Sequence, residues 1–281
     1  MNQQTVYIVY FSPAGTTRMV AQALAHEAST AGYPVVSLDL ASRSTDVKVV
    51  QSRISKGDIL FAGTPVYANH PVPVVMDFLA GLSETEGAYA APFVTFGAVS
   101  SGVALREMAT MAKEKKMTVL GGIKVAARHS MLWQSDAPLG KGRPDEKDMA
   151  EVARFAQAVM GKASADGKAG PLPEDALNYQ RQEVQEAAKA AGLHVIKPML
   201  LPFDVNIDAC TQCGLCVENC PTANITLEEG PVFADRCVVC FNCVRVCEPG
   251  AISSKVLPFI EADLHKRLDF FREPAETVAF V

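Results

Sequence analysis

The sequence predicts an α/β fold, with a doubly wound parallel sheet of five strands followed by a separate cysteine-rich unit. Three observations support this prediction. Apolar runs alternate with helical patterns from residue 5 to about 161, the runs are continuous, and all eight cysteines fall between residues 210 and 247. Continuous apolar runs are typical of strands that are covered on both faces, as in a parallel sheet.

The predicted strands are rich in Val, Ile and Phe, and helical patterns lie between them. The five strands cover residues 5–11, 34–40, 58–63, 91–97 and 118–127. One face of the first helical segment holds Val20, Ala23, Leu24 and Ala28, and one face of the last holds Met149, Val152, Ala156 and Val159. Apolar faces of this kind cover a sheet, so the alternation predicts a doubly wound sandwich.

We expect the chain to divide into four parts. These are a first domain over residues 1–161, a linker with a helical spacer over 162–200, a cysteine-rich domain over 201–256 and a C-terminal strap over 257–281. Gly, Ala, Lys and Pro are frequent in residues 162–176, as in a linker, and helix formers in 178–192 end at Gly192, which suits a C-cap. The strap carries Phe259, Phe270, Phe271 and Phe280. We expect it to pack back onto a domain rather than to dock a partner.

Composition narrows the class of protein. The 281 residues are 49% hydrophobic and 20% charged, which is ordinary for a globular protein with a sizeable core. The net charge of −5 and the lack of a basic stripe give no reason to expect nucleic acid as a partner. We see no transmembrane-length apolar run and no secretory signal before the first strand. We therefore expect a cytoplasmic protein without membrane insertion, in which the clustered cysteines are not a disulfide framework.

The cysteines form two runs with the same spacing. The first is Cys210-x2-Cys213-x2-Cys216-x3-Cys220, and the second is Cys237-x2-Cys240-x2-Cys243-x3-Cys247. Three thiolates spaced by two residues can wrap one iron–sulfur cluster, while the fourth reaches another cluster. Zinc is the alternative, but it is usually held by separate C-x2-C pairs or by a Cys/His mixture. The duplicated run therefore favours two [4Fe–4S] clusters.

At these residues the chain resembles a bacterial two-cluster ferredoxin domain, a small α+β fold, over residues 204–252. The resemblance implies that Cys210, Cys213, Cys216 and Cys247 hold one cluster and that Cys220, Cys237, Cys240 and Cys243 hold the other. One departure is Glu248, which separates Cys247 from the proline that usually follows it. Acidic residues outnumber basic ones here: Asp204, Asp208, Glu218, Glu228, Glu229, Asp235 and Glu248 against Arg236, Arg245 and Lys255. An acidic surface beside the clusters would steer a basic partner protein.

A candidate phosphate loop, FSPAGTTR, covers residues 11–18 between the first strand and the first helix. It lacks the signatures of nucleoside-triphosphate loops and of dinucleotide folds. Its hydroxyls, its glycine and the free amides of a helix N-terminus suit one terminal phosphate. A plain Ser/Thr helix cap is the alternative, and the loop alone leaves both open.

Two further loops, residues 63–71 and 96–102, follow the third and fourth strands, where ligands bind in open α/β sheets. With the first loop they make residues 5–161 resemble a flavodoxin, including the GRPD opening of the last helix at 142–145. The resemblance implies FMN, with its phosphate on Ser12, Ala14, Gly15, Thr16 and Thr17. It implies that Pro65, Val66, Tyr67 and Ala68 line one side of the flavin ring and Phe96, Gly97 and Ala98 the other.

Several aromatic and histidine residues lie in or near these loops, and each could either contact the flavin or have a structural role. The second ring loop lacks the aromatic residue that many flavodoxins have, so stacking on the flavin falls to Tyr67 or to Trp133. We favour an ordinary core-covering role for Trp133, and structural roles for the loop histidines His70 and His129.

The whole chain resembles the flavodoxin–ferredoxin fusion family. That resemblance implies a low-potential electron-transfer protein, which passes electrons between FMN and two [4Fe–4S] clusters and exchanges them with a redox partner protein. The flexible linker would let the ferredoxin domain dock on the flavin or swing to the partner. An FMN-dependent reductase of a small substrate is the alternative, with the clusters as its internal supply. A redox sensor with little turnover is the third interpretation.

Overall fold

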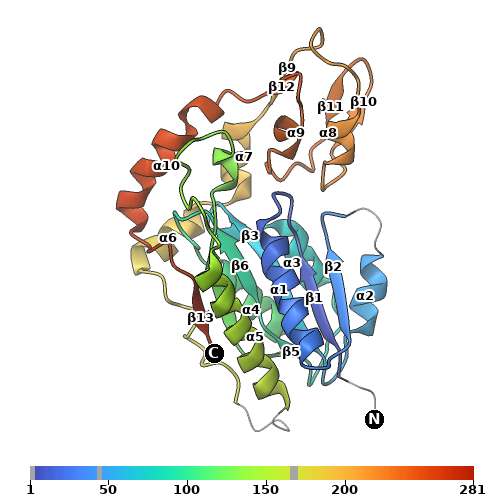
Figure 1. The fold of residues 1–281 in the computed structure, drawn as a ribbon, viewed down its shortest axis with the longest axis vertical. Coiled ribbons are helices and arrows are strands. Elements are labelled where there is room, and N and C mark those ends of the chain that lie inside the picture. Colours follow the sequence, from blue (N-terminus) through green and yellow to red (C-terminus); the bar gives the residue numbers. More distant parts are fainter. Residues whose placement is uncertain (1–3, 43–45, 165–169) are drawn as a thin grey trace.

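The computed structural model describes residues 4–42, 46–164 and 170–281. Its main sheet contains parallel strands in the order β2–β1–β3–β6–β8 (Figure 1). These strands are β1 (Val6–Tyr10), β2 (Val35–Asp39), β3 (Ile59–Tyr67), β6 (Phe93–Phe96) and β8 (Gly122–Ala126). Counted along the chain, the order is 2-1-3-4-5, which is that of flavodoxin-like doubly wound sheets. The predicted fold class is therefore confirmed.

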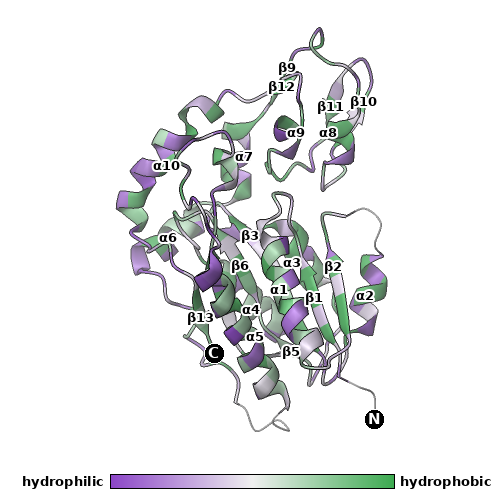
Figure 2. Cartoon of the chain, viewed as in Figure 1, coloured by the Kyte–Doolittle hydropathy of each residue, from purple (hydrophilic) through white to green (hydrophobic). Residues whose placement is uncertain are grey.

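Helices cover both faces of this sheet, and each face has its own apolar core. Helices α1 (Thr16–Thr30) and α5 (Glu146–Ser164) pack on one face, and α2 (Val47–Arg53), α3 (Pro73–Ala80) and α4 (Ala104–Glu114) pack on the other. Figure 2 shows hydrophobic residues along the central strands and mixed colouring on the covering helices. The predicted apolar faces of the first and last helices are buried around Leu24 and Val152, as helical periodicity requires.

The fifth predicted strand is interrupted, because β7 (Thr118–Val119) and β8 are separate strands. Beside β8 runs β13 (Val278–Phe280), antiparallel and with Val278 opposite Lys124. A Cβ atom at Gly121 would lie 2.7 Å from the carbonyl oxygen of Phe280, so glycine permits this close approach. The remaining short strands of the sheet are β4 (His70–Pro71), paired with β3, and β5 (Tyr89–Ala90), paired with β3 and β7.

Much of the predicted linker packs against the α/β domain instead of being exposed to solvent. Leu172 and Leu177 are buried in the core under α3 and α4, and the rings of Tyr179 and Phe280 stack with centroids 4.7 Å apart. Helices α6 (Gln182–Ala190) and α7 (Leu193–Leu200) follow. Residues 165–169 of the predicted linker lie outside the described residues.

The cysteine-rich unit contains two antiparallel strand pairs and two short helices. Strand β9 (Asp204–Val205) pairs with β12 (Ile252–Ser253), and β10 (Ile225–Leu227) pairs with β11 (Pro231–Phe233). The helices are α8 (Leu215–Glu218) and α9 (Asn242–Arg245). Its small core includes Phe203, Ile225, Phe241 and Ile252.

The tail returns to the first domain. Helix α10 (Leu257–Phe271) leaves the cysteine-rich unit and leads to β13 at the edge of the main sheet (Figure 1). The cysteine-rich unit is therefore connected through two segments that both pack on the α/β domain. No helix in the described parts of the chain is long and apolar enough to span a membrane.

Candidate cofactor sites

A cavity of about 480 Å³ opens at the carboxyl ends of the parallel strands. It is within the size range of small-molecule and cofactor sites. Its wall includes most of the residues for which the sequence predicts FMN contact: Ser12, Ala14, Thr16, Thr17, Pro65, Val66, Tyr67, Ala68, Phe96 and Gly97. Gly15 stands between two of them at the start of α1, and Ala98 is buried directly after Gly97. The three predicted loops thus meet at one place.

The first loop leaves amide groups available for an anion. Helix α1 begins after Gly15, whose φ of 94° is left-handed and which makes no side-chain cap. The hydroxyl of Ser12 accepts a hydrogen bond from the Arg18 amide at 2.9 Å. The hydroxyls of Thr17 and Thr95 bond each other at 2.8 Å beside the cavity. Ser12 thus caps the Arg18 amide, while the amides of Thr16 and Thr17 and the positive helix dipole would fit one phosphate dianion.

The two ring loops brace each other. Ala68 and Asn69, after β3, have left-handed φ values of 49° and 73°, and the carbonyl of Asn69 accepts the Val103 amide at 2.8 Å. A Cβ atom at Gly102 would lie 2.1 Å from that carbonyl oxygen, so only glycine fits. The two loops therefore contact each other closely, and they would fit a planar ring system between Tyr67 and Gly97.

Several cavity residues were missed in the sequence interpretation. Thr95, Asn69 and residues 127–131 line the cavity, and the last segment follows β8. Asn69 lies within the predicted loop 63–71, and the rule that ligands bind at the carboxyl ends of strands also applies to the segment after β8. The apolar wall from α7 and α10, including Ile196, Leu200 and Ile260, depends on long-range packing and carries no local signal.

The structure shows the contacts of three residues whose roles the sequence does not decide, Trp133, His70 and His129. Trp133 does not line the cavity but lies between domains, 5.0 Å below the Arg245 guanidinium and 6.5 Å from the Phe241 ring. His70 donates to Glu107 at 2.9 Å and to the Ala188 carbonyl at 2.8 Å, which is a structural role. His129 lines the cavity against Gly97. Burial, followed by the charge of Arg267, lowers the pKa of His129 to about 4, so its ring is neutral at physiological pH.

The eight thiols gather as two quartets, each around its own small cavity. One quartet is Cys220, Cys237, Cys240 and Cys243, and the other is Cys210, Cys213, Cys216 and Cys247. This is the crosswise grouping that the ferredoxin resemblance implies. Among the described residues, no group of three or more His, Cys, Asp and Glu side chains could hold a single metal ion.

The surroundings of the first of these quartets fit an iron–sulfur cluster. The Asn224 side chain is buried beside it, and its amide nitrogen has no partner among the described residues. Backbone amides of Asn224 and Val239 donate to the sulfurs of Cys220 and Cys237 at 3.2 and 3.3 Å. Donors aimed at sulfur are a known means of tuning clusters. Burial raises the pKa of Cys240 to about 12, so iron binding would have to displace its proton.

The same quartet lies against the α/β domain. Val239 lines the large cavity, and Val238 is buried in the core of the α/β domain, against which Tyr67 and Cys240 also pack. Burial, and then the nearby Cys240 thiol, raises the pKa of Tyr67. We call Cys220, Cys237, Cys240 and Cys243 the inner quartet for this reason. We call Cys210, Cys213, Cys216 and Cys247 the outer quartet, in which Cys213 is exposed.

Comparison with known proteins identifies the cysteine-rich unit. Residues 204–248 match the family model described as a 4Fe–4S dicluster domain. The chain is 33% identical over 94 residues to the methylamine utilization ferredoxin-type protein MauM of Methylorubrum extorquens, covering 29% of this chain and 43% of that protein. It is 29% identical over 85 residues to the ferredoxin-type protein NapG of Escherichia coli, covering 26% and 37%. The chain thus spans about two fifths of the length of these relatives.

Among solved structures, the α/β domain is similar to rubredoxin oxygen:oxidoreductase from the anaerobe Desulfovibrio gigas. The TM-score is 0.47 at 21% identity, over 59% of this chain and 38% of that one. A flavodoxin from the domain Archaea matches with a TM-score of 0.43 at 19% identity, over 57% of this chain and 99% of that one.

The strand order and the family match together define the class of protein. A flavodoxin-like sheet is joined in one chain to a 4Fe–4S dicluster domain of the ferredoxin type. The expected fusion architecture is therefore confirmed. Its cysteine-rich unit matches a 4Fe–4S dicluster domain and is similar in sequence to ferredoxin-type proteins.

Proposed function

We propose that this chain is an electron-transfer protein that uses FMN and two [4Fe–4S] clusters. The observation that carries the proposal is the contact between the two candidate sites. Tyr67 and Val239 line the FMN cavity, and both lie beside the inner quartet. When bound, FMN supplies exchange of one or two electrons and each cluster supplies exchange of one.

The chain's own residues would hold these groups in fixed positions. The amides at the start of α1 would hold the FMN phosphate, and the two ring loops would hold the flavin between Tyr67 and Gly97. The inner quartet would hold the cluster nearer the flavin, and the outer quartet would hold the cluster nearer solvent. The order of sites is then cavity, inner quartet, outer quartet.

The outer quartet also offers a surface for a redox partner protein. Exposed acidic residues belong to the same cysteine-rich unit: Asp208, Glu218, Glu228, Glu229 and Glu248. None of them takes part in an ion pair within the part of the chain that the structure describes. An acidic surface favours a basic partner and speeds its encounter. Transfer to that partner should slow as salt rises, because exposed charges are screened beyond about 8 Å at physiological ionic strength.

A flavin enzyme is the second candidate, and the shape of the cavity favours it. The cavity extends past the predicted FMN residues to an apolar wall on α7 and α10 that includes Met199, Phe259 and Leu264. A small apolar substrate could bind there over the ring. Steady-state turnover of small acceptors by a variant without the inner quartet would support this candidate.

Cofactor analysis of the anaerobically purified protein tests the proposal. We expect one FMN, with about eight iron and eight sulfide per chain. Mass spectrometry of the released flavin distinguishes FMN from FAD. Stoichiometric zinc with little iron, or no flavin after reconstitution with FMN, would contradict the proposal.

A further inference from the structure

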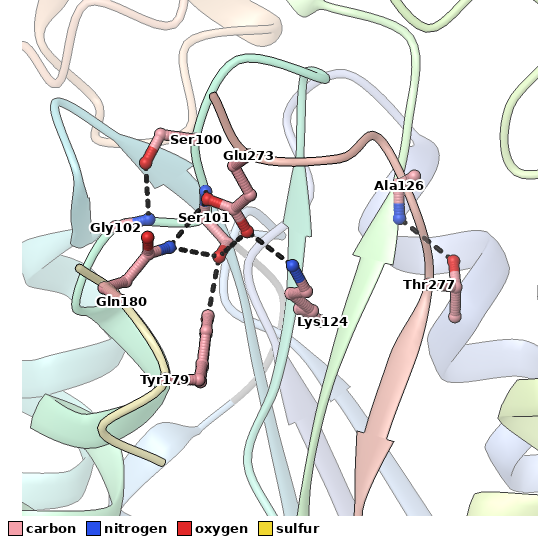
Figure 3. A network of polar contacts seen from close by, with 9 residues as sticks. All are labelled: Ser100, Ser101, Gly102, Lys124, Ala126, Tyr179, Gln180, Glu273 and Thr277. Carbon is pink, nitrogen blue, oxygen red and sulfur yellow. Dashed lines mark hydrogen bonds and ion pairs between the residues drawn. The ribbon is translucent and has the colours of Figure 1, made fainter. Parts of the chain in front are cut away.

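The carboxylate of Glu273 is buried where the tail meets the second ring loop. Its side chain is 5% exposed. It accepts hydrogen bonds from four donors: the Ser101 amide at 2.8 Å, the Ser101 hydroxyl, Lys124 Nζ at 2.6 Å and Gln180 Nε2 at 2.6 Å. Figure 3 shows these groups converging from three separate stretches of the chain. A carboxylate with so many donors is strongly fixed.

The buried ammonium group of Lys124 requires the Glu273 carboxylate as a partner of opposite charge. Lys124 lies in the middle of β8, its side chain is 7% exposed, and its ammonium group is about 5 Å from the rings of Phe96 and Tyr179. A buried ammonium is costly unless it is paired. Within the described residues, Glu273 is the ion-pair partner of Lys124.

The network joins the flavin site to the segments that hold the ferredoxin-type domain. Ser101 belongs to the second ring loop, and Tyr179 bonds its hydroxyl at 2.7 Å from the segment before α6. Glu273 stands two residues after α10, which forms one wall of the cavity. Beyond it, Thr277 accepts the Ala126 amide at 3.1 Å and β13 begins.

We propose that Glu273 is a positioning residue for the flavin site. By fixing Ser101 it sets the conformation of residues 96–102, and by fixing the end of α10 it keeps the cavity wall closed over the flavin. The C-terminal tail thus positions parts of a site that is formed mainly by the first 130 residues. This inference rests on the proposed binding of FMN.

Four proteins test it, each measured as the apo chain and after titration with FMN. Glu273→Gln removes the charge but keeps the shape. The double change Lys124→Met with Glu273→Leu removes both charges, so no unpaired ammonium stays buried. Glu276→Gln removes an exposed carboxylate from the same tail and is the matched control. The fourth protein is the wild type.

We expect Glu273→Gln to lower the melting temperature by roughly 6 to 12 °C, because it leaves a buried charge unpaired. The double variant should recover most of that stability. Both variants should bind FMN about ten- to a hundredfold more weakly than the wild type, as loss of a charged hydrogen bond at Ser101 predicts. Glu276→Gln should match the wild type in both measurements.

The separate measurements distinguish two kinds of failure. If the folded double variant bound FMN with wild-type affinity and wild-type flavin fluorescence, Glu273 would be only a stabilising residue and the inference would be wrong. If the wild type itself bound no FMN, the proposed function would fail instead, whatever the melting temperatures showed.

Discussion

Gly15 belongs to the loop that we propose for the FMN phosphate. Its φ of 94° is left-handed, and no atom lies within 4 Å of where a Cβ would be placed. A side chain there would therefore strain the backbone and crowd the phosphate, although it would not clash with the protein. We predict that Gly15→Val abolishes FMN binding in an equilibrium titration. Gly57→Ala is the control, because Gly57 has a φ of 89° and the same open surroundings, and it precedes β3 at the amino ends of the strands, away from the cavity.

Glu248 is the residue by which the second cysteine run departs from the family pattern. Its side chain is exposed beside Cys247, in the outer quartet. A carboxylate about 6 Å from a cluster in water's dielectric disfavours reduction by about 0.7 kcal/mol, or about 30 mV for one electron. Glu248→Gln should raise the potential of the outer cluster by this amount in a redox titration. The effect would reach about 120 mV only at an effective dielectric of about 20. An unchanged potential would show that the charge is fully screened, and Glu84→Gln is the distant control.

His70 carries a pH dependence whose sign follows from its partners. Both ring nitrogens face acceptors, the Glu107 carboxylate and the Ala188 carbonyl, and the bond to Glu107 is the main cause of a raised pKa. Because the folded pKa is raised, the stabilisation is complete below the unfolded value of about 6.5 and is lost as pH rises through the folded pKa. Urea unfolding should show the wild type losing more stability than His70→Gln between pH 6 and pH 9. Equal losses in the two proteins would mean that His70 is not charged in the fold.

At the scale of elements, the main strands and the loops that line the large cavity could be predicted because their signals are local. Largely apolar runs define β1, β3 and β8, and loops at the ends of those strands meet by topology. The cysteine spacing likewise defines its own loops. None of these depends on a distant part of the chain.

Strand β13 at the edge of the sheet and the cavity wall from α7 and α10 could not be predicted, because they depend on contacts between distant parts of the chain. Strand β13 and the Glu273 network involve pairs such as Ser101 and Glu273, which are 172 positions apart. The residues before α6 have the composition of a linker, yet Leu172 and Leu177 are buried. Tertiary packing decides these positions, and no local periodicity records it.

The fluorescence of Trp133, the only tryptophan of the chain, can be used to monitor the interface between α9 and the first domain. Arg245 stacks on its ring and donates to the Ser130 carbonyl at 2.9 Å. We predict that Arg245→Ala shifts Trp133 emission to longer wavelength, because the half-buried indole becomes more hydrated. Arg236→Ala removes the same charge from an exposed position of the same domain and should leave the spectrum unchanged. Identical spectra for both variants would place the interface elsewhere.

At the scale of the whole molecule, two connections hold the ferredoxin-type domain to the sheet. One enters through α6 and α7, and the other returns through α10 and β13. This arrangement favours a fixed internal distance between cofactors over a swinging domain. Internal exchange of electrons should then be independent of protein concentration, whereas exchange with a partner should depend on concentration and salt.

We propose that electrons pass between the flavin and the clusters through the inner quartet. The most direct measurement is the rate of cluster reduction after anaerobic photoreduction of FMN, followed by absorbance over a tenfold dilution series. The wild type should show one rate at every concentration. A variant with Ser at Cys210, Cys213 and Cys216 should keep that rate for its remaining cluster, and one with Ser at Cys237, Cys240 and Cys243 should bind FMN but lose fast transfer. Undiminished transfer in the second variant, or a rate that falls on dilution, would contradict the account.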